Sequence, residues 1–293
     1  MSTIVLFSDS SCDIPDTFRS KYNVKLIPYY VTFDQETYYK EIDELSISSF
    51  YTQMRASRIF PKTSLPSIDD YMRAFNPYVE QGLPIICVCL SSYFSGSYNA
   101  AINARTIILE HYPNAQIAII NSLNATGGQY LLVEQIAHMI EDGLEFNKIV
   151  VNAKKLRETS RIFFYVDTLD YLEEGGRIGK AAALLGTVLN VKPVLFLEDG
   201  QLFPCNKMRG KKRATHKVVA LMKQYVASQG SDDYAFAICH GDCPEDASLL
   251  AAVFESVMGT AAPEPFNVIG VTIGVNTGPD AQGIACIKKY DKL

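Results

Sequence analysis

The chain has 293 residues, of which 48% are apolar, and a formal net charge of −5. It can therefore bury a substantial core, in one large or two medium domains. The acidic balance argues against a protein whose main task is to hold nucleic acid, although residues 207–213, KMRGKKR, form a local basic patch. No apolar run approaches the length of a membrane span, and the start of the chain has no signal-peptide pattern, so we expect a cytosolic protein.

Cysteine and histidine placement argues against a disulfide framework and a metal site. The seven cysteines are an odd number, and most of them lie within apolar runs. The four histidines are far apart, and none is spaced with a cysteine or carboxylate as a ligand set requires. We expect neither a metal nor a cofactor.

Strands and helices alternate through about the first 160 residues, which predicts an α/β layer fold. Residues 24–33 read as an edge strand because Pro28 lacks an N–H, and Tyr29 and Tyr30 in it are placed to cover a cavity. The acidic residues 41–44 read as solvated. The expected strands are 3–7, 24–33, 85–90 and 116–120, and the expected helices are 15–22, 47–56, 68–81, the segment after Ser97, 124–142 and 147–160.

The second half of the chain also mixes strands and helices. Asp199-Gly200 is a strong hairpin signal between two strand-like runs. The expected strands are 161–166, 192–197, 201–206, 234–240, 266–273 and 283–288, and the expected helices are 178–189, 211–229 and one beginning at Pro244.

The stretch 84–104, PIICVCLSSYFSGSYNAAINA, carries the first candidate site. An apolar run typical of a buried parallel strand stops at a serine-rich turn, and a segment of small helix-forming residues follows. Unpaired N–H groups and the positive end of the helix dipole favour an anion there, and Gly96 lets a ligand approach the backbone. We predict an anionic group at 95–97. The alternative is that Ser95 only caps the helix.

An enzyme with Ser95 as nucleophile is a second hypothesis. The local sequence Tyr93-Phe94-Ser95-Gly96-Ser97 lacks the leading glycine of a nucleophile elbow, and His240 and Asp242 follow in an unusual order for a hydrolase. A phosphate loop at 175–181 is matched only in part, because Lys180 precedes Ala181 rather than a hydroxyl residue. Both patterns are weak.

The chain instead offers neutral hydroxyl donors without a poised base. Residues 61–67, PKTSLPS, form a loop stiffened by two prolines, which can place Thr63 accurately. Thr63 and Ser95 could hold a carboxylate through charge-assisted hydrogen bonds of about 1.5–3 kcal/mol each. An attached hydrocarbon tail would add about 0.8 kcal/mol per buried methylene. This inventory favours a binding protein.

Over essentially its full length the chain resembles the DegV family of fatty-acid-binding proteins. The motifs that carry the resemblance are Ser8-Asp9-Ser10, residues 63–67 (TSLPS), the turn at 91–97, residues 167–169 with 175–180 (GGRIGK), and residues 274–279 (GVNTGP). The sequence departs from the common pattern at Asn276, where many members have histidine, and at Leu65, where glutamine is frequent. Asparagine can still donate a hydrogen bond, but it cannot become cationic.

The resemblance implies two α/β domains with a largely parallel sheet in the first and a mixed sheet with helices in the second. We place them at residues 1–160, which carry the carboxylate-binding loops, and 161–293, which help to enclose the acyl chain. A long-chain fatty acid would be the ligand, with its carboxylate bound at Thr63 and Ser95 and with Gly96 and Asn276 beside it. No further cofactor is implied.

The resemblance also implies that the protein is not itself an enzyme but an acyl carrier. It would present the bound fatty acid to a separate fatty acid kinase related to dihydroxyacetone kinases, which forms an acyl phosphate for phospholipid synthesis. Arg177, Lys180 and Arg209 are candidates for docking that kinase or for transient contact with a membrane surface, and ordinary solvated charge is the alternative for each. The rival hypotheses are a serine hydrolase using Ser95 and a regulatory protein-binding module without lipid.

Overall fold

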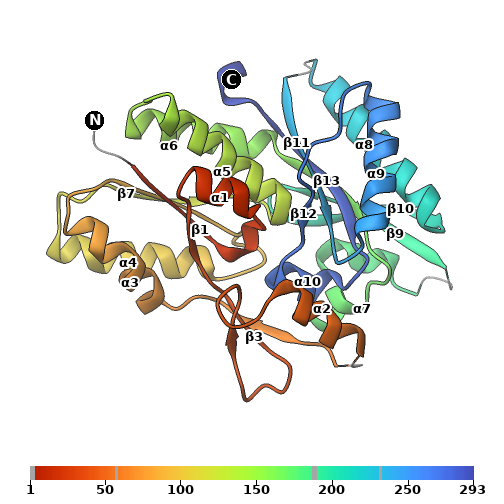
Figure 1. The fold of residues 1–293 in the computed structure, drawn as a ribbon, viewed down its shortest axis with the longest axis horizontal. Helices are drawn as coiled ribbons and strands as arrows, with labels where there is room; N and C mark the ends of the chain where they lie inside the picture. Colours follow the sequence, from red (N-terminus) through yellow and green to blue (C-terminus); the bar gives the residue numbers. More distant parts are fainter. Residues whose placement is uncertain (1–3, 57–58, 187–189, 231–232) are drawn as a thin grey trace.

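The computed structural model describes residues 4–56, 59–186, 190–230 and 233–293. Three β-sheets with surrounding helices make up the molecule, and Figure 1 shows the first sheet on one side and the second on the other. The first sheet has the strand order β2-β1-β6-β7 and is parallel throughout. Its strands are β2 (Lys25–Ile27), β1 (Val5–Asp9), β6 (Ile85–Cys89) and β7 (Ile117–Asn121).

The first sheet is covered on both faces, as the apolar run at 85–90 predicts. All residues of β1, β6 and β7 are buried. Helices α3 (Ile68–Val79) and α4 (Ser97–His111) supply one apolar layer, in which Phe75 and Ala101 pack with Phe7 of β1. Helix α5 (Thr126–Glu141) belongs to another layer, which contains Leu6 and Val88. The carboxyl ends of β1 and β6 lie side by side, and the chain leaves them toward opposite edges of the sheet. Such a switch point is where parallel α/β sheets place their ligands.

The second sheet has the order β10-β9-β8-β13-β11-β12 and is mixed, since only the β11–β12 pair is parallel. Helices α8 (Lys211–Ser228) and α9 (Pro244–Met258) pack against it, and so do α5 and α6 (Phe146–Thr159). The strands are β8 (Arg161–Tyr165), β9 (Val191–Glu198), β10 (Gln201–Arg209), β11 (Tyr234–His240), β12 (Asn267–Val268) and β13 (Gln282–Lys288). Because α5 packs against strands of both sheets, one apolar core runs through the molecule.

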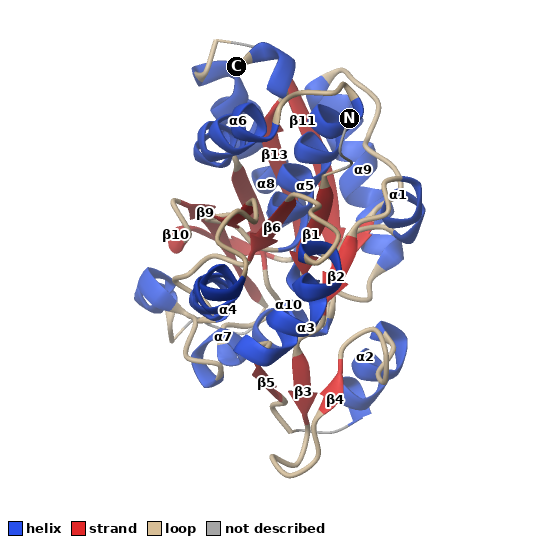
Figure 2. Ribbon diagram, turned by 90° about the vertical axis from the view of Figure 1, so that its left-hand side faces the viewer, coloured by secondary structure: helices blue, strands red, loops and turns tan. Residues whose placement is uncertain are grey.

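A small sheet of order β4-β3-β5 stands apart from the other two, as Figure 2 shows. It consists of β4 (Tyr39–Lys40), β3 (Tyr30–Thr32) and β5 (Lys62–Ser64). Helix α2 (Ile47–Ala56) and helix α10 (Val271–Thr277) meet beside it, where Phe50 and Tyr51 pack with Val271 and Val275. The remaining elements are η1 (Ser10–Cys12), α1 (Asp16–Lys21), α7 (Asp170–Glu174), η2 (Gly179–Leu184) and η3 (Tyr290–Lys292).

Three predicted elements differ from the structure. Residues 24–33 form two short strands in different sheets, β2 and β3, because the chain leaves the first sheet at Pro28. Residues 266–273 form the two-residue strand β12 and then the start of α10, whose N-cap is Gly270. Residues 178–189 contain the 3₁₀ helix η2 rather than an α-helix, and 187–189 lie outside the described residues.

Other expectations are confirmed. The hairpin turn lies at Asp199-Gly200, which join β9 to β10, and both residues have positive φ, as a tight turn of this kind requires. The α/β architecture, with a parallel four-stranded sheet and a mixed six-stranded sheet, agrees with the expected fold class, while the division at residue 160 stays a prediction. Among the described helices, none combines the length and apolarity needed to cross a bilayer.

Candidate functional site

Ser95 lies in the loop between β6 and α4, directly before the helix begins at Ser97. Its Oγ accepts one hydrogen bond from the Ser97 N–H at 3.1 Å and another from the Tyr29 hydroxyl at 2.8 Å. The loop is held closed by the Ser95 N–H, which donates to the carbonyl of Ser91 at 3.2 Å. Ser95 therefore accepts the N–H of the first residue of α4, although Gly96 is the N-cap of that helix, and a side chain from a distant segment contacts Ser95 as well.

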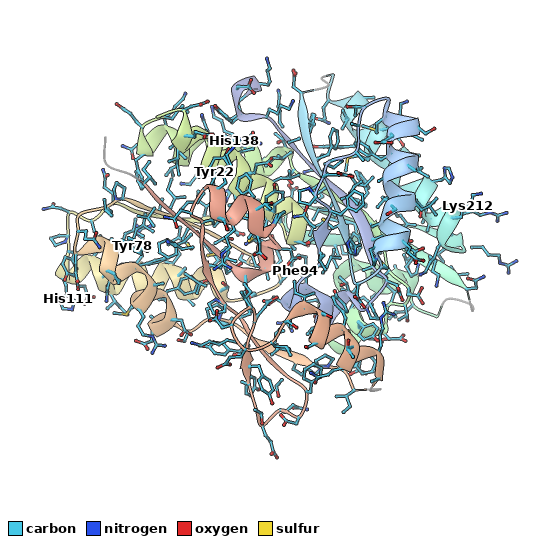
Figure 3. The ribbon with its side chains drawn as sticks, viewed as in Figure 1. Tyr22, Tyr78, Phe94, His111, His138 and Lys212 are labelled. Atoms are coloured by element: carbon cyan, nitrogen blue, oxygen red, sulfur yellow. The ribbon has the colours of Figure 1, made fainter. Side chains whose placement is uncertain are left out.

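Thr63 reaches the same place from the small sheet. It is the middle residue of β5, where it pairs with Val31 of β3. Thr63 and Ser95 line one cavity of about 230 Å³, together with Tyr29. Phe94, labelled in Figure 3, is another lining residue and comes from the loop that carries Ser95. The structure thus brings together two hydroxyl residues that the sequence places in separate loops.

The body of the cavity is apolar. Strands of the second sheet contribute much of its wall, and α10 adds Ile273. The apolar residues include Leu90, Ile162, Phe164, Leu197, Leu202 and Ile273. A cavity that is lined by both apolar side chains and polar groups is typical of a site for an amphipathic small molecule.

Asn276 also lines the cavity, and its side-chain amide donates to the carbonyl of Thr272 one turn earlier in α10, at 3.2 Å. Its Oδ1 lies against Gly175, where an added Cβ would come within 2.1 Å. Gly96 is adjacent to Ser95 but is not among the residues that line the cavity, and a Cβ there would lie 3.4 Å from Leu65. The approach of a ligand to the backbone at Gly96 stays a prediction.

The three basic residues that the sequence groups together lie in different surroundings. Arg177 lines the cavity and donates to the carbonyls of Phe94 at 3.1 Å and Gly175 at 2.6 Å. Lys180 is exposed and lies over the ring of Phe203, with its Nζ 4.3 Å from the ring centroid. Arg209 is exposed at the end of β10 and does not line the cavity. Arg177 alone of the three therefore joins the loop of Ser95 to the second half of the chain.

A buried polar network supports this site, and the sequence analysis did not assign it a role. Asp9, at the end of β1, accepts hydrogen bonds from the Leu90 N–H at 2.9 Å and from the Ser97 hydroxyl at 2.7 Å. Its other oxygen accepts from Ser11 and Gln129. Burial raises the pKa of Asp9, and these hydrogen bonds oppose the rise. Two signals in the sequence point to Asp9: it is a carboxylate at the end of an apolar run, and it belongs to the motif Ser8-Asp9-Ser10.

Glu41 corrects the prediction that residues 41–44 are solvated, because its side chain is 2% exposed. It accepts hydrogen bonds from Ser10 at 2.6 Å and from the Thr272 hydroxyl at 2.5 Å. Asp43 and Glu44 are exposed, as expected. Glu41, directly after β4 of the small sheet, thus links that sheet to η1 through Ser10 and to α10 through Thr272.

The described residues do not assemble a hydrolase triad around Ser95. His240 uses its Nδ1 to accept the Cys243 N–H at 3.2 Å, and burial lowers the pKa of the imidazole. Asp242 forms an ion pair with Arg55 at 3.1 Å. Both predicted partners of a nucleophilic serine are therefore engaged elsewhere.

One group of potential metal ligands lies outside the cavity. Ligand atoms of Cys243, Asp246 and Asp280 come within 4.8 Å of one another. However, the Lys211 ammonium donates to Asp246 at 2.6 Å, and Arg55 pairs with Asp280 at 3.2 Å. Burial also raises the pKa of the Cys243 thiol to about 12, so the thiolate that a metal needs is disfavoured. Cationic side chains already neutralise this cluster.

Comparison with known proteins places these features in a family. The family model described as "Uncharacterised protein, DegV family" matches residues 3–289. A DegV domain-containing protein of Clostridium perfringens is 32% identical over 280 residues, covering 95% of each chain, and one of Clostridium acetobutylicum is 33% identical over 283 residues, covering 96% of each.

Solved structures agree with the sequence relatives. A stearic-acid-binding protein from Eubacterium ventriosum is 38% identical, with a TM-score of 0.95 and full coverage of both chains. A fatty-acid-binding DegV family protein from Thermus thermophilus is 26% identical, with a TM-score of 0.87, and covers 98% of this chain and 100% of its own. The match to the family model and the two curated relatives lead to one conclusion: the chain belongs to the DegV family.

Proposed function

We propose that this protein binds a long-chain fatty acid, with the carboxylate at Thr63 and Ser95 and the hydrocarbon chain in the apolar cavity. The observation that carries the proposal is that Thr63 in β5 and Ser95 in the loop between β6 and α4 line one cavity with many apolar residues in its wall. The stearic-acid-binding protein of Eubacterium ventriosum, which has nearly the same fold, supports this ligand class.

The head group is held by neutral donors. A carboxylate gains roughly 1.5–3 kcal/mol from each charge-assisted hydrogen bond, and two hydroxyls would supply two of them. Asn276 is a further contact, although its amide must then be shared with the carbonyl of Thr272. Gly96 lies directly beside Ser95, where a ligand could approach the backbone.

The hydrocarbon tail supplies most of the affinity. At about 0.8 kcal/mol per buried methylene, a chain of a dozen carbons contributes roughly 10 kcal/mol before the cost of ordering it. The head group supplies the smaller share of the affinity and mainly fixes the orientation of the ligand. No catalytic base is required for such a role, and neither His240 nor Asp242 is available to serve as one.

We further propose the carrier role that the resemblance to the DegV family implies. The protein presents the carboxylate to a separate fatty acid kinase related to dihydroxyacetone kinases. There a carboxylate oxygen attacks the terminal phosphoryl group of a nucleoside triphosphate, the bridging P–O bond breaks, and the nucleoside diphosphate leaves, which yields an acyl phosphate for phospholipid synthesis. Arg177 is placed to meet such a partner, because it is exposed and lines the cavity that holds the ligand. Lys180 and Arg209 extend the basic surface over η2 and β10.

The setting of this function is the cytoplasm, with transient contact to a membrane surface as the source of the ligand. Residues 1–160 supply Thr63 and Ser95, and residues 161–293 supply Asn276 and much of the tail's wall. The two predicted domains therefore enclose the ligand between them.

Mass spectrometry of an organic extract of the purified, denatured protein tests the proposal. We expect one long-chain fatty acid per chain. A protein that purifies without lipid and shows no thermal shift with fatty acids would instead be a regulatory protein-binding module. Time-dependent labelling of Ser95 by a fluorophosphonate probe would favour the serine hydrolase.

A further inference from the structure

The hydroxyl of Ser95 has both of its acceptor positions occupied. A serine hydroxyl offers one hydrogen to donate and two lone pairs to accept with. The Tyr29 hydroxyl donates to Ser95 Oγ at 2.8 Å, and the Ser97 N–H donates to the same atom at 3.1 Å. The hydrogen of Ser95 is then the part of the group that remains for a ligand in the cavity that both Tyr29 and Ser95 line.

Tyr29 is held as a donor by its surroundings. Its ring is buried, with 2% of the residue exposed, and burial raises the pKa of the phenol well above its usual value, so it keeps its proton. Its backbone is fixed on both sides: its N–H donates to the Ser10 hydroxyl at 3.0 Å, and its carbonyl accepts the Glu41 N–H at 2.9 Å. The phenol therefore stays beside Ser95.

The second donor is anchored just as firmly. Ser97 is the first residue of α4, whose N–H has no partner within the helix. The Ser97 hydroxyl donates its one hydrogen to Asp9, so the Tyr71 hydroxyl, 2.5 Å away, must donate to Ser97. These contacts hold the Ser97 N–H in place below Ser95.

We propose that Tyr29 is a positioning residue: with the Ser97 amide it holds Ser95 as a one-way hydrogen-bond donor, and this makes the cavity selective for a carboxylate over an uncharged head group of the same chain length. The inference rests on the proposed function, because it assigns head-group selectivity to that same site. A neutral alcohol can also accept this hydrogen bond, but charge-assisted hydrogen bonds are about twice as strong as neutral ones.

Tyr29→Phe tests the role, because it removes the hydroxyl and keeps the ring. Calorimetric titration of delipidated protein with dodecanoic acid and with 1-dodecanol gives a ratio of the two affinities. We expect this ratio to fall about 3- to 10-fold in Tyr29→Phe, with most of the change in the acid. Tyr30→Phe is the matched control, since the neighbouring phenol donates to Asp70 at 3.0 Å and does not line the cavity. Its ratio should equal that of the wild type.

Two further variants make the test decisive. Ser95→Ala should lower the same ratio at least as far as Tyr29→Phe, and Tyr29→Phe should add little in the Ser95→Ala background, because Tyr29 acts through Ser95. The inference is overturned if the ratio of acid to alcohol affinity in Tyr29→Phe or in Ser95→Ala equals that of the wild type. It is also overturned if Tyr29→Phe lowers the ratio equally in the wild type and in the Ser95→Ala background. Absence of dodecanoic acid binding to the wild type would instead overturn the proposed function.

Discussion

Glu41 and Thr272, 231 residues apart in the sequence, are joined by two hydrogen bonds: the Thr272 hydroxyl donates to Oε2 at 2.5 Å and its N–H donates to Oε1 at 3.2 Å. The pair fastens the small sheet, which carries Thr63, to α10, which carries Asn276. Because the carboxylate also accepts from Ser10, it organises three segments around the cavity.

We expect Glu41→Ala to lower the free energy of unfolding by about 2–4 kcal/mol, because it leaves buried donors of Ser10 and Thr272 without an acceptor. Urea denaturation measures the change. Glu44→Ala is the matched control: Glu44 is exposed and accepts the Lys40 N–H at 2.7 Å, so the substitution should cost less than about 1 kcal/mol. Equal effects of the two substitutions would contradict the assignment.

Asp13→Asn should change how stability depends on pH. Both carboxylate oxygens of Asp13 are buried without a hydrogen-bond partner among the described residues. Burial raises the pKa of this carboxyl well above its usual value, and the nearby Glu41 carboxylate adds to the rise. Since the folded state binds the proton more tightly than the unfolded state, the stabilisation is complete below about pH 4 and is lost as pH rises toward the folded pKa.

Between about pH 4 and the raised pKa of Asp13, the free energy of unfolding of the wild type should therefore fall by about 1.4 kcal/mol per pH unit. Asp13→Asn should not show this fall. We expect the variant's advantage in the free energy of unfolding to be larger at pH 8 than at pH 5 by about 1 kcal/mol or more, as measured by urea denaturation. Asp16→Asn, on the exposed side of α1, is the control. An identical difference at the two pH values would count against a buried, proton-binding Asp13.

The double variant Thr63→Ala, Ser95→Ala should retain the fold but lose fatty acid. Removing two charge-assisted hydrogen bonds of about 1.5–3 kcal/mol each weakens binding by two orders of magnitude or more. Thermal unfolding checks the fold, and mass spectrometry of the extracted lipid gives the occupancy. Thr106→Ala, which removes a hydroxyl bonded to Ile102 on the exposed side of α4, should leave occupancy unchanged. Full occupancy in the double variant would refute the head-group site.

Arg177→Ala should speed the release of the ligand. Its guanidinium links the Phe94 carbonyl to Gly175 beside the cavity, so its loss frees the loop that carries Ser95. We expect the dissociation rate of a fluorescent fatty acid to rise about 3- to 10-fold, which corresponds to roughly 0.7–1.4 kcal/mol, the net value of one typical hydrogen bond. Lys180→Ala is the comparison, because Lys180 contacts Phe203 and does not line the cavity. Equal dissociation rates in the two variants would argue against a role for Arg177 in retaining the ligand.

Much of the local structure could be predicted from residue patterns. The apolar run at 85–90 is the buried strand β6, and Asp199-Gly200 form the expected turn, because strand burial and tight turns are encoded by adjacent residues. The same reasoning placed Ser95 at the junction between a strand and a helix. The two strand runs that failed, 24–33 and 266–273, are interrupted where Pro28 and Gly270 redirect the chain.

The chain alone therefore determined the α/β class, the turn at Ser95 and the choice of Thr63 as its companion, since these depend on periodicity, on turn residues and on motifs within a few positions. Only the tertiary structure decided that Glu41 is buried, that Tyr29 donates to Ser95, and that Arg177 rather than Lys180 reaches the cavity. The physical reason is that burial and hydrogen-bond partners are set by segments that come together across as many as 231 residues, and no local pattern records such distances.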